Sequence, residues 1–199
     1  MPTIVVAKSE MSVLEEELVT RKVLPLLFGA SVLAWILLVS AIGVSMSAEA
    51  SKLVKVRDEC TESFNVFFGD PTICQQPDGK VDIFVFFNYL SRHQRHPLWR
   101  FDPESFDLPK GKQVALQNLG GEFHTWTKVA EFGGGVIPEL NFGQAARPEC
   151  FQDESINNVF LEYGDLETGA TAGSADLPAG THKFMCCIHP WMKTVVKVN

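Results

Sequence analysis

The residues with the clearest potential for chemistry lie in one short stretch near the C-terminus, residues 184–192. Within it, Cys186, His189 and Met192 follow the spacing Cys-x2-His-x2-Met, which puts a thiol, an imidazole and a thioether within seven residues. A copper ion that carries one electron uses these donors, because thiolate suits Cu(I), imidazole suits both oxidation states and a thioether is a weak axial ligand. The stretch therefore predicts three ligands of a copper site.

A short loop supplies only one side of such a site, so the fourth ligand has to come from a distant segment. The candidate is His124, which follows the β-prone segment 112–118. Zinc is the main competing metal, but a thioether is a poor zinc ligand. A two-copper centre is disfavoured because the adjacent side chains of Cys186 and Cys187 point in opposite directions on a strand.

This pattern resembles the mononuclear blue copper proteins, the cupredoxins, of the amicyanin and plastocyanin kind. The resemblance covers roughly residues 81–198 and is strongest at the two ligand segments. It implies one type 1 copper ion, with His124, Cys186 and His189 in a near-trigonal plane and Met192 as the axial ligand. It also implies outer-sphere electron transfer without bond chemistry, so we expect no catalytic residues. One departure from the family pattern is Cys187, since a small or polar residue usually follows the ligand cysteine.

In this family the second ligand histidine reaches the surface through an apolar patch where partners dock and electrons enter. The resemblance assigns Pro190 and Trp191, beside the ligand loop, to that patch. It also implies that Trp126 and Phe132 shield the copper, although both have an alternative interpretation as ordinary core aromatics. The glycine-rich loop 132–135 resembles a less familiar bacterial subgroup and is expected to close over the site.

Short apolar segments separated by Gly and Pro turns predict an all-β domain, a Greek-key β-sandwich, over residues 81–199. The expected strands are residues 81–87, 112–118, 159–163, 181–186 and 194–198. Residues 47–80 are expected to form a connector with a disulfide loop.

The five cysteines are an odd number, and one copper thiolate leaves four, enough for two disulfides in an oxidising compartment. Cys60 and Cys74 bracket a loop that contains Gly and Pro and are the natural first pair. Cys150 and Cys187 are then the second pair, with separate buried thiols as the alternative.

The N-terminal part predicts a membrane anchor. Residues 1–22 are a polar lead, and residues 23–46 carry no charge, which as a helix of ~36 Å is enough to cross a bilayer. A cleaved signal peptide is the alternative, but the lead is long and acidic for one. Flanking positive charges do not decide the orientation. Because disulfides belong outside the cytoplasm, we expect a single-pass protein with a cytoplasmic N-terminus and a periplasmic or other extracytoplasmic copper domain.

The net charge is −7, and no basic cluster indicates nucleic-acid binding. The expected function is electron transfer with a redox partner protein or a membrane redox complex, alone or as a subunit. The alternative is a copper-handling protein that holds and delivers Cu(I). An enzyme is disfavoured, because only His93, His96 and His182 remain for further copper sites. His93 and His96 allow a second metal site, but an ordinary solvated loop is the simpler interpretation.

Overall fold

The computed structural model describes residues 52–76, 78–155, 157–168, 172 and 177–199. The expected lead 1–22 and membrane span 23–46 lie outside these residues. Among the helices that are described, none is both long enough and apolar enough to cross a bilayer.

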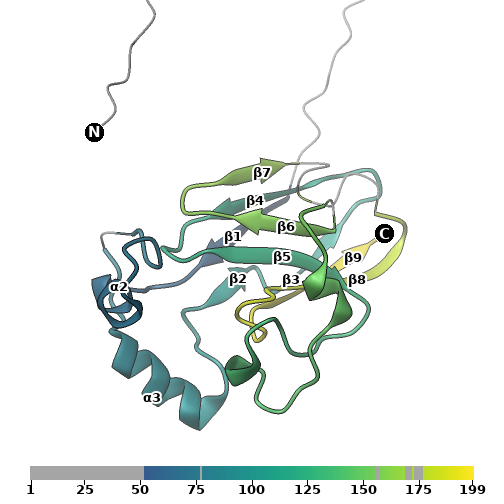
Figure 1. Cartoon of the computed structure of the whole chain (residues 1–199). Helices are drawn as coiled ribbons and strands as arrows, with labels where there is room; N and C mark the ends of the chain where they lie inside the picture. Colours follow the sequence, from purple (N-terminus) through teal and green to yellow (C-terminus); the bar gives the residue numbers. More distant parts are fainter. Residues whose placement is uncertain (1–51, 77, 156, 169–171, 173–176) are drawn as a thin grey trace, which may run out of the picture. The chain divides into compact units, whose positions relative to one another are not determined.

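Within these described residues, nine strands form two β-sheets (Figure 1). The first sheet has the order β2 (Arg100–Asp102), β1 (Lys52–Arg57), β4 (Val114–Asn118), β7 (Leu166–Thr168). The second has the order β3 (Ser105–Leu108), β9 (Lys193–Val198), β8 (Gly180–Met185), β5 (His124–Val129), β6 (Asn158–Leu161). Among the described strands, only β1 with β4 and β3 with β9 are parallel pairs. The chain passes between the sheets after β2, β3, β4, β6 and β7.

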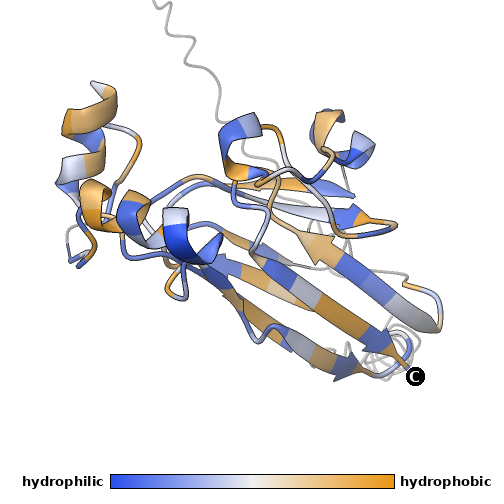
Figure 2. Ribbon diagram, turned by 90° about the horizontal axis from the view of Figure 1, so that it is seen from below, coloured by the Kyte–Doolittle hydropathy of each residue, from blue (hydrophilic) through white to orange (hydrophobic). Residues whose placement is uncertain are grey.

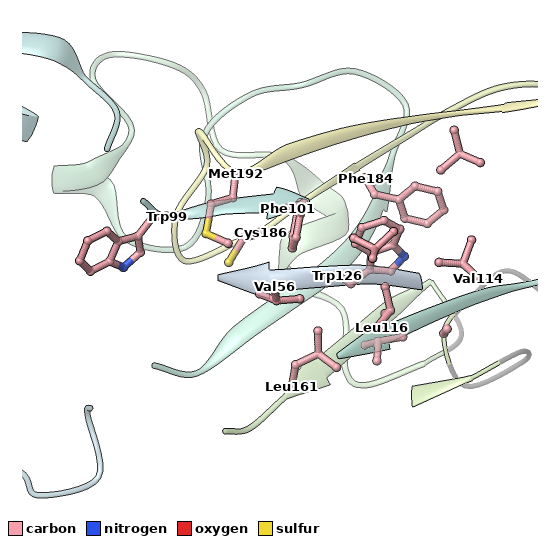
Figure 3. Close-up of a cluster of buried hydrophobic side chains, with 14 of the residues drawn as sticks. Val56, Trp99, Phe101, Val114, Leu116, Trp126, Leu161, Phe184, Cys186 and Met192 are labelled. Carbon is pink, nitrogen blue, oxygen red and sulfur yellow. The ribbon is translucent and has the colours of Figure 1, made fainter. Parts of the chain in front are cut away.

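The two sheets enclose one main apolar core. Val56 and Leu116 of the first sheet pack in the same buried cluster as Trp126, Leu161 and Phe184 of the second (Figure 3). Apolar and polar residues alternate along several strands, as expected where one face is buried (Figure 2). The expected β-sandwich is therefore confirmed, and four expected strands appear as β4, β6, β8 and β9.

The expected connector contributes to the sandwich itself. Strand β1, which lies in residues 47–80, pairs in parallel with β4, with Val54 opposite Leu116. Both Val54 and Val56 are fully buried. The described part of this segment is thus a central strand of the first sheet followed by a helix.

The strand expected at residues 81–87 is wrong, because helix α3 spans Ile83–His93. Asp82 caps its N-terminus by accepting a hydrogen bond from the Phe84 amide at 2.8 Å. The buried residues Ile83, Phe86 and Leu90 are spaced three and four apart, which is the period of a helix face. A short run of apolar residues does not by itself distinguish these two structures.

Helices α2 (Glu62–Phe68) and α3 lie together at one end of the sheets (Figure 1). The rings of Phe64 and Phe86 pack 5.4 Å apart, and Phe86 lies 4.6 Å from Trp99. Two short 3-10 helices, η1 (Pro138–Leu140) and η2 (Pro148–Phe151), interrupt the long loop between β5 and β6. Together these segments surround the end of the sandwich that carries the ligand residues.

Candidate metal centre

A tight turn after β4 presents His124 as the first residue of β5. Asn118 organises this turn, since its side-chain nitrogen donates to the carbonyl oxygens of Glu122 (3.0 Å) and Leu161 (3.2 Å). Its side-chain oxygen accepts from the Gly120 amide at 3.0 Å. A Cβ atom on Gly120 would lie 2.0 Å from the Asp58 carboxylate, so only glycine allows this close approach.

The turn between β8 and β9 carries the other three predicted ligands. The Cys186 amide donates to the Met192 carbonyl at 3.0 Å, and the Met192 amide donates to the His189 carbonyl at 2.8 Å. The Cys186 sulfur accepts hydrogen bonds from the amides of Thr125 and His189, both at 3.4 Å. These bonds fix the thiol against both the ligand loop and strand β5.

The side chains of His124, Cys186 and His189 converge. The Cys186 sulfur lies 3.8 Å from Nδ1 of His124 and 3.9 Å from Nδ1 of His189, and the three atoms all lie within 4.8 Å of one another. Donors bound to one ion at about 2.0–2.3 Å are separated by roughly this distance. His124 and Cys186 are fully buried, and His189 is 4% exposed. One thiolate and two imidazoles in this arrangement fit a single copper ion.

Met192 lies beside this group. It is buried, its backbone is bonded to Cys186, and the two side chains are drawn in the same region of the core (Figure 3). Its thioether is thus available as the weak fourth donor that the sequence predicts.

The metal-free site favours a thiolate. Burial opposes ionisation of Cys186, but hydrogen bonds and positive charge from His124 and His189 hold the pKa of this thiol well below its ordinary value. Burial also disfavours a charged His124, yet its hydrogen bonds to Asp58 and Cys186 raise its pKa to about 10. The thiolate is the form of cysteine that binds metal.

Each ligand histidine is backed by a buried carboxylate that sequence reasoning missed. Nε2 of His124 lies 2.8 Å from Oδ2 of Asp58, and Nε2 of His189 lies 3.5 Å from Oε2 of Glu122. Glu122 Oε2 also accepts a hydrogen bond from the indole of Trp99. The one signal in the sequence is the Gly120–Gly121 pair shortly before His124. Two adjacent glycines indicate that another part of the chain, here Asp58, lies too close to this turn for a side chain.

Both expected disulfides are confirmed, Cys60–Cys74 and Cys150–Cys187. Among the described residues Cys186 is the only free cysteine. Cys186 belongs to the main core, whereas Cys187 packs in a separate buried cluster with Val129 and Met185. Of the two adjacent cysteines, Cys186 therefore has a free thiol, and Cys187 forms a structural disulfide.

The two residues of the expected docking patch differ in exposure. Pro190 is buried, whereas Trp191 is half-buried and its ring lies 5.4 Å from the His189 ring. Trp126 stacks on Phe184 at 4.5 Å in the core between the sheets. Phe132 packs against the cluster around Cys187.

The remaining histidines do not form a second site. His96 packs against Trp99 and Tyr89, with ring centroids 4.6 Å and 4.9 Å away, and burial lowers its pKa to about 4. His182 contacts the Pro178 carbonyl oxygen at 2.7 Å. Within the part of the chain that is described, His124, Cys186 and His189 are the only three His, Cys, Asp or Glu residues placed to share a metal ion.

A cavity of about 630 Å³ opens beside His189. Its lining is mostly apolar and comes from α2, α3 and η1, with Phe68, Phe87 and Leu140 as examples. The polar residues His189 and Glu122 also line it. The cavity is therefore an apolar route from the surface to one edge of a ligand histidine.

No protein-family profile matches the chain, and no curated protein matches it. Among solved structures, a purple cupredoxin from Nitrosopumilus maritimus has a TM-score of 0.41 and 13% identity, covering 75% of this chain and 100% of that one. An oxidised plastocyanin from Dryopteris crassirhizoma has a TM-score of 0.35 and 17% identity, covering 74% and 99%. A reduced amicyanin variant has a TM-score of 0.30 and 16% identity, covering 50% and 73%.

Proposed function

We propose that this protein is a mononuclear copper protein that transfers single electrons by an outer-sphere route. The observation that carries the proposal is the convergence of one free thiol and two imidazole nitrogens, all buried, at distances that suit one ion. His124, Cys186 and His189 would hold the copper, and the thioether of Met192 would supply a weak fourth donor. When bound, copper supplies a one-electron couple between Cu(I) and Cu(II).

The protein's own residues keep the site rigid and dry. Amides of Thr125 and His189 bind the Cys186 sulfur, and the turn that begins at Asn118 holds His124. Donors fixed in advance do not rearrange when the charge at the site changes, and fixed hydrogen-bond donors to sulfur stabilise the thiolate. Burial of the donor atoms keeps water away from the ion.

Electrons exchange through His189, whose ring lines the apolar cavity between α2, α3 and η1. We expect a redox partner protein, or a membrane redox complex of which this chain is a subunit, to contact this opening through an apolar surface. Trp191, half-buried beside His189, forms another part of that contact. The proposed contact thus extends the expected docking patch to residues of helices α2 and α3.

The proposed location is extracytoplasmic, with residues 23–46 as a membrane anchor. Two disulfides, Cys60–Cys74 and Cys150–Cys187, support an oxidising compartment. An uncharged segment of 24 residues supports the anchor. Anchoring restricts diffusion and raises the effective concentration of partners in the same membrane.

Spectroscopy of the copper-loaded full-length protein in detergent tests this function. An electron carrier is intensely coloured when oxidised, gives the EPR spectrum of a thiolate-bound Cu(II) and cycles reversibly. Cys186→Ser is expected to abolish the colour, while His182→Ala, which changes a half-buried histidine of β8 outside the metal centre, is expected to retain it. A colourless protein that holds Cu(I) and releases it to a chelator would instead support copper delivery.

A further inference from the structure

Asp58 is a carboxylate with no exposed side-chain surface, at the end of strand β1. Its Oδ2 contacts Nε2 of His124 at 2.8 Å and accepts from the Glu122 amide at 3.0 Å. Its Oδ1 accepts from the Gly121 amide at 2.9 Å and the Cys60 amide at 3.2 Å. Three backbone donors and one imidazole satisfy the carboxylate, and such hydrogen bonds favour its charged form.

This contact determines what His124 offers to a metal ion. A neutral imidazole carries one N–H and one lone pair, and the partner of one nitrogen decides which form is present. With the Nε2 proton donated to Asp58, the lone pair is on Nδ1, which faces the Cys186 sulfur at 3.8 Å. Asp58 therefore selects the tautomer of His124 that binds a metal ion from inside the site.

We propose that Asp58 is a positioning residue of the copper centre, which fixes His124 in the Nδ1-binding tautomer and lowers the reduction potential. The inference rests on the proposed function. A buried negative charge one imidazole away from the ion stabilises the more positive Cu(II) state over Cu(I). The fold creates this contact by placing Asp58 beside His124, which lies 66 positions further along the chain.

His189, the second histidine of the site, has a similar but weaker contact with a carboxylate. Glu122 lies 3.5 Å from Nε2 of His189, and the same carboxylate oxygen already accepts from Trp99. The Asp58 contact is shorter, and its four donors hold it in place. We therefore expect the two carboxylates to differ, with Asp58 having the larger effect on the copper.

The test is the reduction potential of Asp58→Asn in the copper-loaded full chain. Asparagine has a similar shape but no charge, so at a fixed ambient potential the Cu(I) to Cu(II) ratio is expected to rise about tenfold, which is ~59 mV for one electron. Glu122→Gln is expected to give a smaller rise. The matched control is Asp102→Asn, which removes an exposed carboxylate paired with Arg57 in the same sheet and is expected to change the ratio less than twofold. An Asp58 variant that behaves like the control overturns the proposal.

Nitrogen NMR of the histidines gives a second measurement, and its result in the unaltered protein does not depend on a variant folding. In the diamagnetic Cu(I) protein, His124 is expected to carry a slowly exchanging Nε2–H, and Asp58→Asn is expected to make this proton exchange at least tenfold faster. A proton on Nδ1, or a fast-exchanging Nε2–H in the unaltered protein, overturns the proposal. If the chain binds no copper, the proposed function is wrong. The same NMR experiment on the metal-free chain then still tests the contact between Asp58 and His124.

Discussion

Thr125 binds both cysteines of the Cys186–Cys187 pair. Its amide donates to the Cys186 sulfur at 3.4 Å, and its hydroxyl oxygen accepts from the Cys187 amide at 2.7 Å. One residue of β5, next to His124, thereby fixes the strand end that carries the thiolate. The two ligand segments, 62 positions apart at these residues, are held in register by this residue.

Thr125→Val tests this link, because valine has the same shape and lacks the hydroxyl group. The buried Cys187 amide loses its acceptor, which is expected to lower the free energy of unfolding by about 1–3 kcal/mol. Urea denaturation of the metal-free protein measures this change. Thr181→Val, an exposed substitution on β8, is the control, and an equal effect in both variants would contradict the role of Thr125.

Copper loading is expected to release a proton near pH 7. In the metal-free protein His124 is protonated, since its pKa is raised to about 10, while Cys186 is already a thiolate because its pKa is well below the ordinary value. Copper replaces the proton on His124, so the apparent affinity should rise about tenfold per pH unit between pH 6.5 and 10. Titration calorimetry in buffers of different ionisation enthalpy counts the protons. A pH-independent affinity would contradict this assignment.

The raised pKa of His124 also makes the stability of the metal-free fold sensitive to high pH. The folded pKa of His124 is raised above 6.5, so its contribution to stability is fully present below pH 6.5 and is lost as the pH rises through about 10. Thermal unfolding of the metal-free protein at pH 6.5 and pH 10 checks the sign. His182→Ala, which changes a half-buried histidine outside the metal centre, is the control and is expected to lose stability between the two pH values as the unaltered protein does.

The ligand loop was predictable because Cys186, His189 and Met192 are close in the sequence and carry distinctive donor atoms. His124 was predictable because it follows an expected strand. Asp58 was not, since its place depends on β1 pairing in parallel with β4, about 60 residues further along. A single acidic residue in a polar segment gives no signal of that pairing.

Prediction of the fold from the sequence meets the same limit. Strands β4, β8 and β9 are bounded by turn residues and have apolar periodicity, so their positions were predictable. The run that begins at Val81 predicts a strand because aromatic and β-branched residues favour strands. The capping residue Asp82 and the continued helical spacing to Leu90 outweigh that preference.

The Cys150–Cys187 disulfide is expected to stabilise the domain without contributing to the copper spectrum. It closes a segment of 37 residues, and its removal typically costs ~2–5 kcal/mol. The double variant Cys150→Ser/Cys187→Ser avoids an unpaired thiol and is expected to unfold at lower denaturant concentration while keeping its colour. Loss of the colour in this variant would mean that the thiolate ligand is wrongly assigned to Cys186.

The cavity beside His189 is expected to control the rate of electron exchange. Phe87 lines the cavity and is 37% exposed, so Phe87→Glu places a charge in an apolar opening that a partner has to cover. We expect electron self-exchange, measured by NMR line broadening in mixtures of Cu(I) and Cu(II) protein, to slow about tenfold because a charge buried in a contact is costly. The control is Val85→Glu, which adds the same charge to the same helix at a residue that is 58% exposed and does not line the cavity. Equal slowing in the two variants would indicate a general charge effect, and the cavity would then not be the site of electron exchange.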